Sequence, residues 1–116
     1  MKWNLSNNQP IYLQIMEHLR MSIVSGEYPA GSRLPSVRDL AVEASVNPNT
    51  MQRALSQLEN EGLIYSNRTS GRFVTEDETV IQNTRRDLAS GQIRIFYDKM
   101  HDLGYSNPEI KELMRD

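Results

Sequence analysis

The sequence contains no cysteine, which excludes a disulfide framework and a thiolate metal site. Its two histidines, His18 and His101, have no partner histidine or carboxylate at a ligand-like spacing, so no metal and no cofactor is predicted. The N-terminal residues lack the apolar core of a signal peptide, and no apolar run is long enough to cross a bilayer. We therefore expect a cytoplasmic protein with no membrane partner.

The 116 residues also lack the grouping of side chains that catalysis requires. Neither a nucleophile beside a base nor a pair of carboxylates stands out among the histidines and the scattered acids. A small hydrolase or transferase is therefore disfavoured, and we do not expect an enzyme.

An excess of positive charge, the usual mark of a nucleic-acid partner, is absent from the chain, whose formal net charge is −2. The acidic residues are, however, unevenly distributed. Residues 1–75 hold seven Lys or Arg against six Asp or Glu, a net +1, whereas residues 76–116 hold six against nine, a net −3. The first part of the chain can therefore still present a local basic surface.

Residues 35–58 have the pattern of two short helices joined by a tight turn. Ser36 with Asp39 three residues later predicts the start of the first helix, and Asn47 followed by Pro48 predicts the start of the second. Apolar residues follow at helical spacing in both segments: Val37, Leu40, Ala41 and Ala44, then Met51, Ala54, Leu55 and Leu58. Two short helices joined by a tight turn are typical of a helix-turn-helix, which places its second helix in the major groove of DNA.

The polar face of the predicted second helix favours contact with DNA. It carries Asn49, Gln52, Arg53 and Gln57, whose amide and guanidinium groups match base edges. No carboxylate that would repel phosphate occurs between residues 43 and 59.

A β-hairpin wing is predicted after this helix, which Gly62 can end. Residues 63–66 and 71–75 are β-type runs separated by the turn residues 67–70. The tip carries Arg68 and Arg72, with no acid until Glu76, so it suits phosphates or a minor groove. A plain hairpin with solvated arginines remains the alternative.

Upstream of the motif, Pro10 predicts the start of a helix that ends near residues 25–26, and residues 33–34 suit a very short strand. Taken together, many residues at fixed spacings between about 9 and 75 resemble the winged helix-turn-helix domain of GntR-type bacterial transcription regulators. The residues from Val46 to Ala54 are most similar to those of the YtrA-type subfamily. The short length of the chain is also similar to that of this subfamily. The residues that carry the resemblance are Pro10, Ile11, Tyr12, Gln14, Ile15, Leu19, Arg20, Ile23, Gly26, Gly31, Leu34, Pro35, Ser36, Arg38, Leu40, Ala41, Val46, Asn47, Asn49, Thr50, Arg53, Ala54, Leu55, Leu58, Glu59, Glu61, Gly62, Leu63, Ile64, Gly71, Phe73 and Val74.

The resemblance implies particular DNA contacts. Arg38 on the first motif helix would touch the backbone or a base, and Ser70 and Gly71 would approach the minor groove. The residues implied to face the major groove are Asn47, Asn49, Thr50, Gln52 and Arg53, with Arg53 and then Gln52 predicted as base readers.

Three of these implied contacts have structural alternatives. Asn47 can serve as a helix cap, and Thr50 can fold back onto the turn. Arg38 can instead form an ion pair with Glu59 or Glu61.

Two helices are predicted beyond residue 75, a long one from about Glu78 to Leu103 and a short one that Ser106 and Glu109 cap. Gly91 either weakens the long helix or lets another backbone approach. Ala89 lies with several larger residues on a seam that resembles a coiled coil. The residues predicted for a dimer interface are Leu88, Ile93, Phe96, Met100, Leu103, Ile110 and Leu113.

The sequence thus predicts a mainly α fold with a small β-hairpin: a winged helix-turn-helix DNA-binding domain over 1–75 and a helical dimerisation region over 76–116. We expect a homodimer that binds a palindromic site in double-stranded DNA, typically as a repressor. In the alternatives, the C-terminal helices fold back on their own domain, or the winged helix binds another protein. The resemblance also implies that any small-molecule effector would bind a small pocket in or near the dimer interface.

Overall fold

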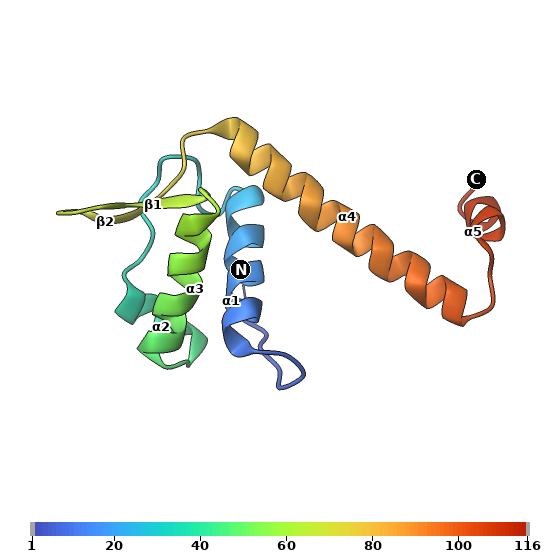
Figure 1. Cartoon of the computed structure of the whole chain (residues 1–116), viewed down its shortest axis with the longest axis horizontal. Coiled ribbons are helices and arrows are strands. Elements are labelled where there is room, and N and C mark those ends of the chain that lie inside the picture. Colours follow the sequence, from blue (N-terminus) through green and yellow to red (C-terminus); the bar gives the residue numbers. More distant parts are fainter. Residues whose placement is uncertain (1, 116) are drawn as a thin grey trace. The chain divides into compact units, whose positions relative to one another are not determined.

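The computed structural model describes residues 2–115, which form five helices and a two-stranded antiparallel sheet (Figure 1). These residues divide into two compact units, one that extends to Arg85 and one that begins at Arg86. The predicted fold class, mainly helical with one small hairpin, is confirmed. In chain order the elements are α1 (Ile11–Val24), α2 (Val37–Ala44), α3 (Pro48–Asn60), β1 (Ile64–Asn67), β2 (Gly71–Val74), α4 (Glu78–Asp102) and α5 (Asn107–Leu113).

Helix α1 begins after Pro10 and ends at Val24, close to both predicted limits. The segment before it is held to it by Gln14, whose amide accepts from the Ser6 backbone N–H at 2.8 Å and donates to the carbonyls of Ser6 and Gln9 at 2.8 Å each. The Trp3 ring stacks on His18 with ring centroids 3.6 Å apart. Residues 2–9 therefore form an ordered arm against α1, which the sequence did not predict.

Side-chain caps start α2 and α3, as predicted. The Ser36 hydroxyl accepts from the Asp39 N–H at 3.1 Å, and the Asn47 side chain accepts from the Asn49 N–H at 2.7 Å. Between the helices Ser45 takes the left-handed conformation, with φ 56°, and the Val46 N–H returns to the Ala41 carbonyl at 3.0 Å. The tight turn of the helix-turn-helix therefore depends on a residue other than glycine in a region that costs it energy.

The wing is a hairpin in which Ile64 pairs with Val74 and Asn67 pairs with Gly71. The segment before α2 meets β2 through an isolated bridge, since Arg33 pairs with Phe73 and the Leu34 N–H donates to the Arg72 carbonyl at 2.9 Å. In place of the predicted very short strand at residues 33–34, the structure has this single bridge at Arg33.

A single apolar cluster joins α1, α2, α3, the base of the wing and the start of α4 through Ile81. The residues of the two motif helices predicted to face inward are buried, except that Val37 is only partly buried. The fully buried residues include Ile15, Leu19, Leu40, Met51, Leu55, Leu58, Leu63, Ile64 and Val74.

In the C-terminal unit, α4 continues past Gly91, where an added Cβ would meet nothing within 4 Å, so no other backbone of the described chain approaches there. The capping box of α5 forms as predicted, with Ser106 and Glu109 bonded reciprocally. Ile110 is fully buried within its own chain. Its predicted place in a dimer interface is therefore corrected, because it belongs to the core of this unit.

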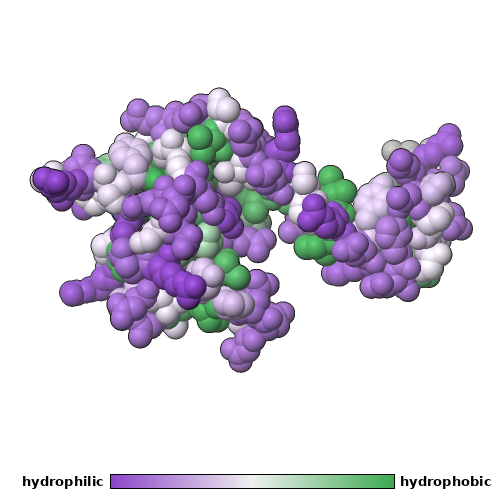
Figure 2. All heavy atoms as spheres, viewed as in Figure 1, coloured by the Kyte–Doolittle hydropathy of each residue, from purple (hydrophilic) through white to green (hydrophobic). Residues whose placement is uncertain are grey.

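The other predicted interface residues of this unit keep surface. Ile93, Phe96, Leu103 and Leu113 are exposed, and Leu88 and Met100 are partly buried. Figure 2 shows hydrophobic side chains reaching the surface along α4. Among residues 2–115, none of the helices combines the length and the hydropathy that a bilayer-spanning helix needs.

Candidate nucleic-acid interface

The exposed face of α3 presents the polar side chains that the sequence singled out. Asn49, Gln52, Arg53 and Gln57 are all exposed, while the opposite face of the helix is buried. The Gln52 amide donates to the Ser56 hydroxyl at 3.3 Å, a weak contact that a ligand can replace. The first two turns of α3 therefore bring together the residues predicted to face a groove.

Asn47 caps α3, so this alternative from the sequence is confirmed. The cap uses Oδ1 only. Within residues 2–115 no hydrogen-bond partner is found for the Nδ2 group of this exposed side chain. The cap is therefore compatible with a second role as a donor.

The Arg53 guanidinium lies over the Tyr12 ring of α1, with Cζ 3.7 Å from the ring centroid. No carboxylate of the described chain pairs with it. Sequence analysis gave Tyr12 no role in the interface, because no local signal relates a residue on α1 to one 41 positions later on α3.

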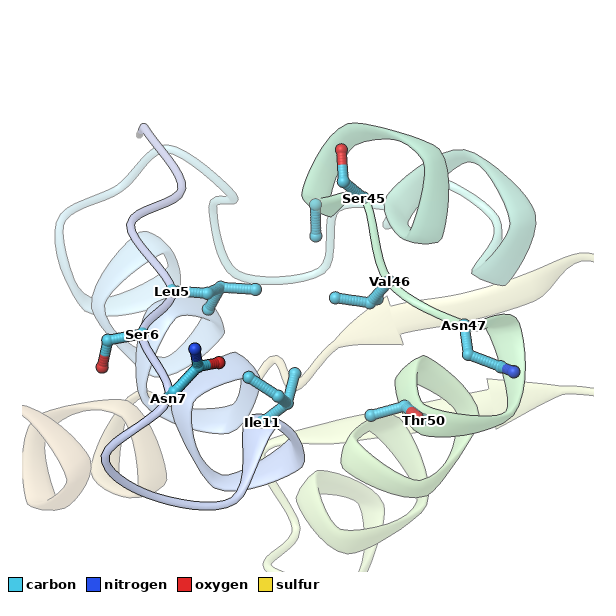
Figure 3. Close-up of a pocket in the computed structure, with 9 residues that line it drawn as sticks. Leu5, Ser6, Asn7, Ile11, Ser45, Val46, Asn47 and Thr50 are labelled. Carbon is cyan, nitrogen blue, oxygen red and sulfur yellow. The ribbon is translucent and has the colours of Figure 1, made fainter.

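A hollow of about 330 Å³ lies between the N-terminal arm, the start of α1 and the turn before α3 (Figure 3). Leu5 and Val46 point toward one another across it, whereas Asn47 points away. No charged side chain lines it. The lining residues are Leu5, Ser6, Asn7, Ile11, Ala44, Ser45, Val46, Asn47 and Thr50.

Arg38 is exposed on α2 and has no ion-pair partner among residues 2–115. The alternative in which it pairs with Glu59 or Glu61 is wrong, because both acids are engaged elsewhere. Glu61 pairs with Arg20 of α1, whose Nε lies 3.1 Å from Oε1, and Glu59 pairs with Arg72.

The two predicted wing arginines have different environments. Arg68 lies exposed in the turn between the strands. Arg72 instead donates from Nε to Glu59 Oε1 at 2.6 Å, and only 18% of its side chain is exposed. The expectation that Arg72 lies free at the tip is therefore wrong, since it ties the wing to the end of α3.

Glu59 also accepts a hydrogen bond from the Ser66 hydroxyl. Burial by itself would raise the pKa of Glu59, but the hydrogen bonds from Ser66 and Arg72 and the charge of Arg72 together hold it below its ordinary value. This carboxylate therefore stays ionised and serves as a brace between α3 and the wing.

Ser70 ends the turn of the wing and Gly71 begins β2, with φ +98°. The Arg33 side chain packs against Gly71, so that a Cβ there would come 3.4 Å from its Nε. Arg33 thus adds a cation to the wing that sequence analysis missed, because the residue is 38 positions away and only strand pairing brings it close.

Comparison with known proteins places these features in context. The family model for bacterial regulatory proteins of the gntR family matches residues 11–74. The chain is 34% identical to the uncharacterized HTH-type transcriptional regulator YhcF of Bacillus subtilis, over 91% of this chain and 88% of that one. It is 31% identical to the HTH-type transcriptional repressor YtrA of the same organism, over 92% and 81%.

Solved structures agree with the fold. A GntR family transcriptional regulator from Listeria monocytogenes superimposes with a TM-score of 0.85 and 38% identity, over 94% of this chain and 96% of that one. The DNA-binding domain of AraR, in complex with operator ORE1, has a TM-score of 0.56 and 26% identity, over 65% and 94%. The family-model match over residues 11–74 covers the helix-turn-helix and the wing described above.

Proposed function

Because the chain belongs to the gntR family of bacterial regulatory proteins and is a DNA-binding transcription regulator, we propose that it acts as a homodimeric repressor of a palindromic operator. The observation that carries this proposal is the exposed start of α3, where Asn49, Gln52 and Arg53 protrude without a carboxylate on the helix before Glu59. Side chains of these types read base edges and contact phosphates.

A dimer is supported by the apolar surface of the C-terminal unit. Ile93 is 57% exposed and Leu103 72% exposed, and both lie on the seam that also carries Phe96. Burial of such side chains in a second copy would remove apolar area from water. A two-fold axis would also present two copies of α3 to two half-sites, which is why the site is proposed to be a palindrome.

Repression is proposed from the similarity to YtrA, which is named a repressor. A regulator that binds bacterial chromosomal DNA acts in the cytoplasm, so the cytoplasmic location belongs to the same proposal. The small-molecule effector stays a prediction. It was expected in or near the dimer interface; the hollow of Figure 3, which no predicted interface residue lines, is a second place to test for it, because its lining is uncharged and adjoins the cap of α3.

The alternative role as a protein-interaction module would call for exposed large apolar residues on α3. Within the described chain, α3 has none.

Selection of preferred duplexes from a random pool, followed by titration, tests the proposal. We expect a palindrome whose half-sites lie about one or more helical turns apart. Gln52→Ala should relax base preference at one position of each half-site, at a loss of about 1–3 kcal/mol. Gln82→Ala, an exposed glutamine on α4 outside this polar face, is the matched control and should leave the preference unchanged. Absence of any preferred duplex at low salt would overturn the proposal.

A further inference from the structure

We propose that Tyr12 is a positioning residue that holds Arg53 as a clamp for a DNA phosphate at the flank of α3, in place of the base-reading role expected from the sequence. The inference rests on the proposed function, since the phosphate is that of the duplex bound by α3. It concerns one contact between two helices of the N-terminal unit.

The contact places Arg53 toward α1. The guanidinium carbon lies 3.7 Å from the centre of the Tyr12 ring, which is a close cation–π distance. Tyr12 is itself partly buried against the apolar core, so its ring is a fixed support. Arg53 is exposed and, without the ring, would be free to sample many rotamers.

The stack leaves the hydrogen-bonding capacity of Arg53 unused. A ring contacts the face of the guanidinium, whereas its five N–H donors lie in the plane. Arg20 and Arg72 of the same unit are neutralised by Glu61 and Glu59, but Arg53 has no such partner within residues 2–115. Arg53 therefore offers both an oriented positive charge and free donors.

The surroundings of Arg53 suit a phosphate. A hollow of about 580 Å³ between α1 and α3 is lined by Arg53 together with the polar Asn49 and Thr50, and no carboxylate residue lines it. Asn, Thr and Arg side chains are common donors to phosphate oxygens. The remaining lining residues are Pro10, Ile11 and Tyr12.

The location on α3 separates this contact from base reading. In a helix-turn-helix the residues at the start of the recognition helix reach the base edges. Gln52 and Arg53 are neighbours on the same turn of α3, but Arg53 lies over Tyr12 of α1, whereas Gln52 bonds along α3 to Ser56 and keeps an exposed side chain. A cation held at that flank neutralises backbone charge and sets the register of the duplex.

The test measures binding of the full chain to the selected operator and to a scrambled duplex of equal length, at several salt concentrations. Arg53→Ala should weaken both by the same factor and lower the slope of log K against log salt by about 0.9 for each subunit. For each subunit, Tyr12→Leu should weaken binding to both duplexes about two- to fivefold, the worth of an exposed cation–π contact, while Tyr12→Phe stays within about twofold. In the Arg53→Ala background, Tyr12→Leu should have no further effect.

Two results would overturn the inference. An Arg53→Ala loss confined to the operator would make Arg53 a base reader, and an unchanged Tyr12→Leu loss in the Arg53→Ala background would make Tyr12 merely structural. If Tyr12→Leu fails to fold, NMR of the free wild-type chain decides, because ring-current shifts of the Arg53 side-chain protons should be present and should persist in Tyr12→Phe. Their absence would overturn the contact, whereas failure of the wild type to bind either duplex would instead overturn the proposed function.

Discussion

Asn47 should have two separable roles, because its two amide atoms face different tasks. Its Oδ1 accepts from the Asn49 N–H at 2.7 Å and caps α3, whereas its Nδ2 has no partner within residues 2–115. Pro48 at the first helical position has no N–H, so the cap serves the first amide of α3 that needs a partner. We expect the oxygen to contribute to stability and the nitrogen to contribute to DNA binding.

The expected loss in the free energy of unfolding is that of one exposed helix cap. Asn47→Ala should lower the free energy of unfolding by about 1 kcal/mol, which is about 4–8 °C in Tm for a domain of this size. Asn47→Ser retains a capping oxygen and should stay within about 0.5 kcal/mol of the wild type. Thermal unfolding followed by circular dichroism measures both variants.

The order of the same variants in operator affinity should differ from their order in stability. Asn47→Ser removes the Nδ2 donor and should weaken operator binding by about 0.5–1.5 kcal/mol, although the protein remains folded. Asn47→Asp also retains the cap but places a carboxylate toward phosphate, and should bind most weakly of all. Wild-type affinity of the Ser variant would limit Asn47 to capping, and full stability of the Ala variant would refute the cap itself.

Three further predictions concern the turn, the wing and the C-terminal unit. Ser45→Gly should raise the free energy of unfolding by up to about 1 kcal/mol, because glycine takes the left-handed conformation without steric strain; Ser45→Ala, which keeps a Cβ, should show no such gain in the same melt. The pKa of Glu59 is lowered in the folded chain, so the carboxylate stabilises the fold above its unfolded pKa, and this stability is lost as the pH falls from about 5 downward. Acid titration of unfolding should therefore show a smaller loss of stability in Glu59→Gln than in the wild type. Equal losses would mean that the contacts of Glu59 with Arg72 and Ser66 do not cause this loss of stability in acid. Phe96→Glu should yield a monomer by light scattering at concentrations where the wild type is a dimer, while Asp98→Lys on the same helix should not; a dimeric Phe96→Glu protein would place the interface elsewhere.

Local chemistry was readable from the sequence because it acts over a few residues. Helix starts at Ser36, Asn47 and Ser106 are each set by a side chain that bonds an amide two or three positions later. The buried face of α3 follows from apolar spacing along one helix. For the same reason the hairpin, with its turn between two β-type runs, could be predicted to within a residue of its observed ends.

The left-handed turn at Ser45 shows where local rules stop. No glycine or asparagine marks the position, and the conformation is imposed by the packing of α2 and α3 on either side of it. Ile110 shows that local sequence rules also do not determine where a side chain is buried. An apolar residue at helical spacing can face its own core or another chain, and here it faces its own core.

By itself the sequence determined the order and limits of the helices and the hairpin, together with the polar start of α3. Only the tertiary structure decided which cations remain free to meet DNA. Arg72 is bound by Glu59, Arg20 is bound by Glu61, Arg53 rests on Tyr12, and Arg38 has no ion-pair partner within residues 2–115. The physical reason is that these partners lie far apart along the chain, 41 residues for Arg20 and Glu61 and 13 for Arg72 and Glu59, so the packing of the elements decides which arginines are paired.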